Sequence, residues 1–174
     1  MKEFLEGLLP RLLPGVPFKC IPHEGKSDLE KSLPRKLRGW RAPGARFIIV
    51  RDQDSGDCVA IKQRLQALCA EAGKPEARVC IACRELEAWF IGDLRAVGRE
   101  FSDSRLAQLQ KKSKYREPDR LESPSRELMA LVPTYGKVQG ARRLGRRLDP
   151  QKSGSSSFRY FAKAVAEEAR QLPI

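Results

Sequence analysis

The sequence is poor in histidine, and this excludes several classes of enzyme. His23 is the single histidine among 174 residues. HExxH metal sites, paired-histidine nucleases and multi-histidine zinc centres all need more than one. The sequence also has no G-x-S-x-G pattern, the nucleophile elbow of the α/β-hydrolases. If this protein is an enzyme, we therefore expect carboxylates, lysines or thiols to carry its chemistry.

Long apolar runs are also missing. No stretch approaches the ~18 apolar residues of a membrane-spanning helix, and the N-terminal residues carry Glu3 and do not resemble a secretory signal. We therefore expect a cytoplasmic protein without membrane contact, in which the five cysteines are reduced thiols. Cys80 and Cys83 form a C-x-x-C pair, but no second pair completes a zinc site, which favours core thiols.

Acidic residues are outnumbered, most strongly in the second part of the chain. Lys and Arg total 34 against 22 Asp and Glu, a net charge of +12. A basic surface favours polyanions, chiefly nucleic acid, with binding that weakens as salt rises; a simply solvated basic face is the alternative. The residues expected to contact phosphates are Lys111, Lys112, Lys114, Arg116, Arg142, Arg143, Arg146 and Arg147.

Apolar spacing in the first hundred residues alternates between helical and extended patterns. Leucines recur at helical intervals over residues 2–13, a capping box of Ser27 and Glu30 begins a second helix, and a third begins near Asp57. Apolar runs predict strands over 18–21, 47–50 and 77–83.

This alternation predicts an α/β fold with a parallel sheet. We expect residues 1–100 to form the core and residues 101–174 to form a basic, mostly helical extension packed on it. Further helices are expected over 86–91, 104–112, 125–131 and 137–147, and over a last segment that includes Phe158 and Leu172.

Acidic residues follow two of the predicted strands directly. Asp52 and Asp54 come after the strand 47–50, and Glu85 and Glu87 come after the next strand. The carboxyl ends of strands in an α/β sheet are where sites gather, and carboxylate oxygens suit Mg²⁺ or Mn²⁺. These four residues are therefore candidate metal ligands. The alternative is that the acids stabilise helix N-termini.

The turn before the second helix carries further candidates. Glu24 is a candidate acid/base or metal ligand, and Lys26 is placed to stabilise charge in a transition state. The alternative is a plain capped helix start. Gly25-Lys26-Ser27 is similar to the end of a P-loop, but Cys20 stands where that motif needs glycine.

Several motifs together resemble a known bacterial family. They are HEGKSDLEKSLPRKLRGW, ARFIIVRDQDSGDC and IACRELEAWFIGD, followed by KSKYREPDRLESPSREL and SSSFRYF. These stretches resemble the family called domain of unknown function 4276, which is regarded as TOPRIM-like. TOPRIM domains form the metal-binding α/β core of topoisomerases, primases and certain nucleases. The family's genes often lie beside those of SMC-like ATPases, an arrangement similar to phage-defence modules.

The resemblance implies Mg²⁺-dependent cleavage of DNA or RNA phosphodiesters, with Asp52 and Asp54 as the D-x-D of the TOPRIM pattern. That pattern also has a glutamate after a first strand, and Glu24 lies only one strand–helix unit before Asp52 where two are expected. An alternative is a catalytically inactive module that binds nucleic acid, an ATPase partner, or both.

The helix over 2–13 has no strand before it, which is unusual in a parallel α/β fold. Either this helix docks independently on the rest of the fold, or a leading strand is absent from the sequence. A sheet without that strand would have an unpaired edge, so we expect the chain to dimerise or aggregate through it.

Overall fold

A computed structural model describes residues 1–172 of the chain. Its centre is a pair of parallel strands, β1 (Ile48–Asp52) and β2 (Arg78–Ala82), in the register Ile48↔Arg78 to Asp52↔Ala82. Both strands consist largely of apolar residues, as expected where a parallel sheet is covered on both faces. The predicted α/β class and the parallel pairing are confirmed.

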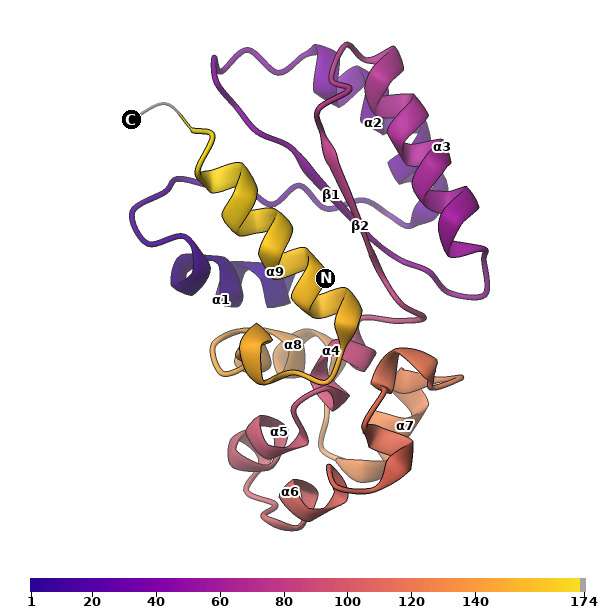
Figure 1. Cartoon of the computed structure of the whole chain (residues 1–174), viewed down its shortest axis with the longest axis vertical. Helices are drawn as coiled ribbons and strands as arrows, with labels where there is room; N and C mark the ends of the chain where they lie inside the picture. Colours follow the sequence, from indigo (N-terminus) through magenta and orange to yellow (C-terminus); the bar gives the residue numbers. More distant parts are fainter. Residues whose placement is uncertain (173–174) are drawn as a thin grey trace.

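Helices cover both faces of the strand pair. Ile49, Val79 and Ile81 pack against α2 (Lys26–Arg38) and α3 (Cys58–Glu71). The alternate side chains, such as Cys80 and Ala82, face α1 (Lys2–Leu12) and α9 (Ser156–Ala169). Figure 1 shows α2 and α3 together on one side of the strands and α1 and α9 on the other.

The remaining helices gather beyond one end of the strands (Figure 1). Trp89 of α4 is fully buried, and its ring stacks on Phe158 and Phe161 of α9 with centroids 5.0 and 5.2 Å apart. The helices beyond the end of the strands are α4 (Glu87–Ile91), α5 (Leu94–Phe101), α6 (Arg105–Leu109), α7 (Pro124–Leu131) and α8 (Lys137–Gly145), with single 3₁₀ turns at Ser113–Tyr115, Pro118–Arg120 and Pro150–Lys152.

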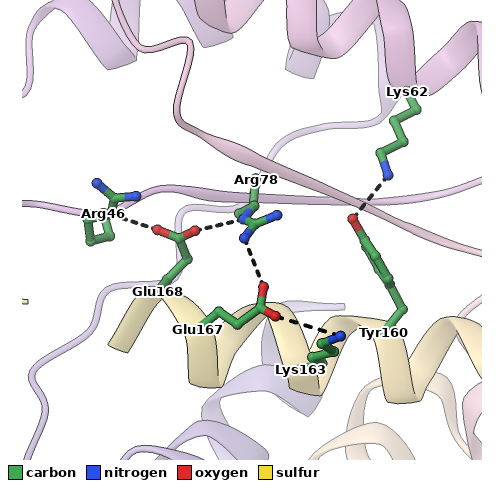
Figure 2. Close-up of polar contacts among 7 residues, drawn as sticks. All are labelled: Arg46, Lys62, Arg78, Tyr160, Lys163, Glu167 and Glu168. Atoms are coloured by element: carbon green, nitrogen blue, oxygen red, sulfur yellow. Dashed lines mark hydrogen bonds and ion pairs between the residues drawn. The ribbon is translucent and has the colours of Figure 1, made fainter. Parts of the chain in front are cut away.

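A buried carboxylate ties α9 to the amino ends of both strands (Figure 2). Glu168 accepts hydrogen bonds from Arg46 Nε at 2.6 Å and from Arg78 Nε at 2.8 Å. Burial raises the pKa of Glu168, but hydrogen bonds from the two guanidinium groups outweigh it and hold that pKa below its usual value. The more exposed Glu167 pairs with Arg78 at 2.8 Å. The last helix is therefore joined to the sheet by charge as well as by packing.

The structure corrects one predicted strand. Residues 18–21 are not a strand and make no ladder with β1. The side chains of Phe18 and Ile21 are 40% and 39% exposed. An apolar run becomes a strand only beside a pairing partner, and none of the described residues supplies one here.

The predicted capping box is also wrong. The N-cap of α2 is Gly25, at φ 108°, and no side chain caps this helix. The Glu30 carboxylate instead accepts hydrogen bonds from Arg51 at 2.8 Å and Arg64 at 2.9 Å. Two guanidinium partners are stronger than a single backbone amide, because both members of each pair are charged.

The cysteines are reduced, and two of them, Cys69 and Cys80, are buried core thiols. All five are free, and Cys80 is buried in the strand pair. Burial raises the pKa of the Cys80 thiol to about 12, so the reactive thiolate is disfavoured. Among the helices formed by residues 1–172, none combines the length and the apolar composition that crossing a membrane requires.

Candidate functional site

Asp52 ends β1 with its carboxylate turned into the protein. By strand alternation its side chain lies on the same face as Ile48 and Val50, toward α1 and α4. Its Oδ1 atom is buried and has no hydrogen-bond partner among residues 1–172. A buried acceptor without a partner is costly, so this atom requires explanation.

Burial raises the pKa of Asp52 to about 6, and the nearby charge of Glu87 and then of Asp54 adds to this shift. The amino group of Met1 and the backbone N–H of Leu86 act in the opposite direction. At neutral pH the ionised carboxylate therefore lies in surroundings that favour either a proton or a cation.

Glu87 is the second acid of this cluster. It begins α4, is 7% exposed and accepts a hydrogen bond from the hydroxyl of Tyr135 at 3.1 Å. Burial, together with the charge of Glu87, raises the pKa of Tyr135, so the phenol keeps its proton and remains a donor. Glu87 could be predicted from the sequence but Tyr135 could not, because their 48-residue separation leaves no local signal.

Asp54 lies in a tight turn just after β1. Its φ is 55°, and its backbone N–H donates to Arg84 O at 2.7 Å, where Arg84 itself has φ 60°. The two turns after β1 and β2 are thus joined directly. The half-exposed carboxylate of Asp54 lies 4.0 Å from Lys26 Nζ, so α2 brings the predicted lysine to the predicted D-x-D.

Two other acids near the strand ends are bonded to other groups, and Glu24 is exposed. Glu85 accepts hydrogen bonds from the N–H of Ser125 at 2.7 Å and from its hydroxyl at 2.9 Å, in the first turn of α7. Asp57 caps α3 by accepting from the N–H of Ala60 at 2.6 Å. Glu24 is exposed. Its backbone N–H donates a hydrogen bond to Asp28 Oδ2 at 3.1 Å, and its carboxylate has no hydrogen bond within residues 1–172.

The acids therefore do not form a ready-made metal cage. Within residues 1–172, no group of three or more His, Cys, Asp or Glu side chains is arranged to hold a metal ion. Carboxylate oxygens are ligands that Mg²⁺ accepts, and Oδ1 of Asp52, near Glu87 and Asp54, has no hydrogen-bond partner within residues 1–172. Mg²⁺ keeps several of its waters and commonly uses one or two carboxylates together with substrate phosphates.

Many of the predicted phosphate-binding residues are paired internally. Arg143 and Arg147 both bind Glu100, at 2.6 and 2.7 Å, and Arg142 binds Glu3. Likewise, Lys114 binds Glu127 at 2.7 Å, and Arg116 donates to the carbonyl of Lys111. Of the eight predicted residues, four have no ion pair within residues 1–172: Lys111, Lys112, Arg116 and Arg146. The basic face is therefore less cationic than the sequence suggests.

Comparison with known proteins identifies the family. The model described as "Domain of unknown function (DUF4276)" matches residues 1–166. The chain belongs to the DUF4276 family. No curated protein and no solved structure matches it. The DUF4276 match includes the strand pair, Asp52, Asp54, Glu87 and the helices that surround them.

Proposed function

We propose that the acidic end of β1 binds Mg²⁺ or Mn²⁺, and that this DUF4276 protein is a TOPRIM-like nuclease that cleaves nucleic-acid phosphodiesters. One observation carries the proposal. The buried Oδ1 of Asp52 has no partner and lies near two other acids, at the carboxyl end of a parallel strand. Such a group is stabilised by a cation, and such strand ends are common sites.

Each residue has a defined role in this proposal. Asp52 and Asp54 would hold the cation, and Glu87, oriented by Tyr135, would bind one of its waters. A cation in this position polarises a phosphate and lowers the pKa of a bound water. Lys26, beside Asp54, would neutralise charge on the substrate phosphate. Glu85 is left out because both of its oxygens are bound to Ser125.

A second candidate is a non-catalytic module that binds nucleic acid, an ATPase partner, or both. The observation that favours it is the lack, within residues 1–172, of three converging metal ligands. The exposed position of Glu24, away from any recorded contact with Asp52, points the same way. An SMC-like ATPase partner and a role in phage defence rest on the family resemblance alone.

A nicking assay separates the two candidates. Supercoiled DNA and a structured RNA are incubated with the protein in Mg²⁺, in Mn²⁺ and in EDTA. The nuclease proposal predicts metal-dependent cleavage that is lost in Asp54→Asn and retained in Glu76→Gln, an exposed acid that lies outside the site. Binding that survives both EDTA and Asp54→Asn, with no cleavage under any condition, would contradict it and favour the binding module.

A further inference from the structure

Two cysteine side chains meet where β2 ends and α3 begins. β1 and β2 are parallel, so the turns that follow them leave the same end of the sheet, and α3 starts there (Figure 1). Cys58 is the first residue of α3, and Cys83 is the first residue after β2. The thiol groups of these two residues are hydrogen-bonded to one another.

The direction of the Cys83 side chain follows from the alternation of the strand. Val79 and Ile81 of β2 pack on the side of the sheet that α2 and α3 cover, whereas Cys80 packs on the opposite side. Cys83 therefore points toward α3 and away from Cys80, the other cysteine of the C-x-x-C spacing. Cys58 packs against the same apolar cluster as Val79 and Ile81. The fold thus pairs two cysteines that are distant in the sequence.

Hydrogen bonds hold both turns in place around this pair. The N–H of Asp54 donates to Arg84 O at 2.7 Å, and the N–H of Arg84 donates to Gln53 Oε1 at 3.1 Å. On its other side, the N–H of Cys83 donates to Ser157 Oγ at 3.3 Å, at the start of α9. The contact between the two thiols is therefore held by three elements of the fold.

The other three cysteines are less suited to reaction. Burial raises the pKa of Cys69 to about 11 and that of Cys80 to about 12, so both thiols keep their protons. Cys20 lies in the segment between α1 and α2, and burial raises its pKa as well. Cys58 and Cys83 are both partly exposed, so a small oxidant can reach them.

Two thiols in contact can hold a metal ion or undergo a redox reaction. A structural zinc site needs four ligands, and within residues 1–172 no further His, Cys, Asp or Glu completes a group that could hold an ion here. Oxidation to a disulfide needs only the two sulfur atoms and an oxidant. In a reducing compartment, disulfides of this kind are mostly transient and redox-sensing.

The surroundings of the two sulfur atoms determine which one reacts first. Cys58 occupies the first turn of α3, where the free N–H groups of the helix stabilise a thiolate. Burial raises the pKa of Cys83, and the nearby charge of Asp119 adds to this shift. Cys58 is therefore the thiol that meets the oxidant, and Cys83 is the thiol that reacts with its product.

We propose that Cys58 and Cys83 are a reversible redox pair, which a hydroperoxide oxidises to an intramolecular disulfide. The Cys58 thiolate attacks the hydroperoxide and its O–O bond breaks. Cys58 becomes a sulfenic acid, and the peroxide, after taking up the Cys58 proton, leaves as an alcohol or, from H₂O₂, as water. The Cys83 sulfur then attacks the Cys58 sulfur, the S–O bond breaks, and hydroxide leaves as water with the Cys83 proton.

The two thiols together lose two electrons, which the hydroperoxide gains. A dithiol reverses the reaction by thiol–disulfide exchange. The disulfide ties the start of α3 to the end of β2, beside the turn that carries Asp54. The inference does not depend on the proposed metal site or on nuclease activity.

Peptide mapping tests the proposal on the full chain. The protein is treated with H₂O₂, its remaining thiols are blocked with N-ethylmaleimide, and it is digested with trypsin without reductant. We expect peptide 52–62, which contains Cys58, to be linked to peptide 79–84, with the bond on Cys83 and not on Cys80. Dithiothreitol should remove the link. The link should form about tenfold or more faster in the folded protein than in urea, because the fold holds the thiols together.

Single variants make the result specific to this pair. Cys58→Ser and Cys83→Ser should each abolish the link, whereas Cys20→Ser removes another partly exposed thiol and should leave it unchanged. In Cys83→Ser the sulfenic acid on Cys58 has no neighbouring thiol to react with, so dimedone, a reagent for sulfenic acids, should label Cys58.

Four results would overturn the proposal. The first is oxidation by H₂O₂ without a link between peptides 52–62 and 79–84. The second is a link that persists in Cys83→Ser, which would place the bond on Cys80. The third is an equal rate of linking in the folded and the urea-unfolded protein. The fourth is a link that increases with protein concentration and yields covalent dimers, which would show a bond between two chains.

Discussion

Asp52 is the residue on which the account of the site depends. Its carboxylate is ionisable, largely enclosed and near two other acids, and one of its oxygens has no partner. An ordinary N-terminal cap, such as Asp57 on α3, is instead bonded to a backbone amide. The two aspartates are five residues apart in the sequence, yet Asp57 is bonded to a backbone amide, whereas Oδ1 of Asp52 has no hydrogen-bond partner within residues 1–172.

The raised pKa of Asp52 predicts how stability changes with pH in EDTA. The carboxyl titrates near 4 in the unfolded chain and at about 6 in the fold. Between these values the folded state binds more protons, so stability should fall as pH rises, by up to roughly 3 kcal/mol. Asp52→Asn should remove this part of the slope and be the more stable protein at pH 7. Urea unfolding from pH 4 to 7 measures both, and parallel slopes would count against the burial of this charge.

Glu85 should behave as a structural residue. Its carboxylate accepts two hydrogen bonds from Ser125 at the start of α7. We expect Glu85→Ala to lower the free energy of unfolding by about 1 kcal/mol, as loss of a helix cap does, and to leave any Mn²⁺-induced shift in melting temperature unchanged. Ser125→Ala should cost a similar amount, and the double variant less than the sum. Loss of the Mn²⁺ response in Glu85→Ala would instead return this residue to the metal site.

At the scale of elements, several helices and the two paired strands could be predicted from local signals in the sequence. The spacing of leucines and the Asp57 cap are local signals, and α1 and α3 lie close to their predicted bounds. The apolar run at 18–21 carries an equally local signal for a strand, but a strand also needs a neighbour. α5 was missed, although Asp93 caps it by accepting from the N–H of Ala96 and could have indicated its start.

In the site, too, local signals could be predicted from the sequence and long-range contacts could not. The proximity of Asp52, Asp54 and Lys26 follows from strand ends and helix starts, which a sequence displays. The use of Glu85 by α7 and the bond between Glu87 and Tyr135 depend on residues 40 or more positions away. No local pattern encodes such partners.

The ion pairs of Glu168 with two arginines beside the strands predict how strongly α9 is held to the sheet. Glu168→Gln should destabilise the protein by roughly 2 kcal/mol, because Arg46 and Arg78 would lose the charged carboxylate to which both donate. Glu167→Gln is the matched control and should cost less than about 1 kcal/mol, since its pair with Arg78 is more exposed. Thermal unfolding of both variants tests this, and equal losses would mean that α9 is held by apolar packing alone.

At the scale of the whole molecule, the net charge of +12 is distributed differently from what the sequence suggests. Glu100 neutralises Arg143 and Arg147, so much of the most basic helix is already paired. If nucleic acid binds this face, Glu100→Gln should strengthen binding by freeing both arginines.

Arg146 is exposed and has no ion pair in the described part of the chain, so Arg146→Glu should weaken nucleic-acid binding. The slope of log affinity against log salt should fall by roughly one for a lost phosphate contact. Lys31→Glu makes the same charge change on α2 and is the control. Identical salt slopes in Arg146→Glu and the unaltered protein would exclude Arg146 from the interface.

The most direct test of the central claim is calorimetric titration of Mn²⁺ into the protein at pH 7. We predict binding that disappears in the double variant Asp52→Asn, Asp54→Asn and remains in Glu76→Gln. Circular dichroism should show that the unaltered protein and both variants are folded. The affinity should decrease toward pH 5, because protonation of Asp52 competes with the cation. Unchanged Mn²⁺ binding in the folded double variant, or no binding to the unaltered protein, would contradict a metal site at the end of β1.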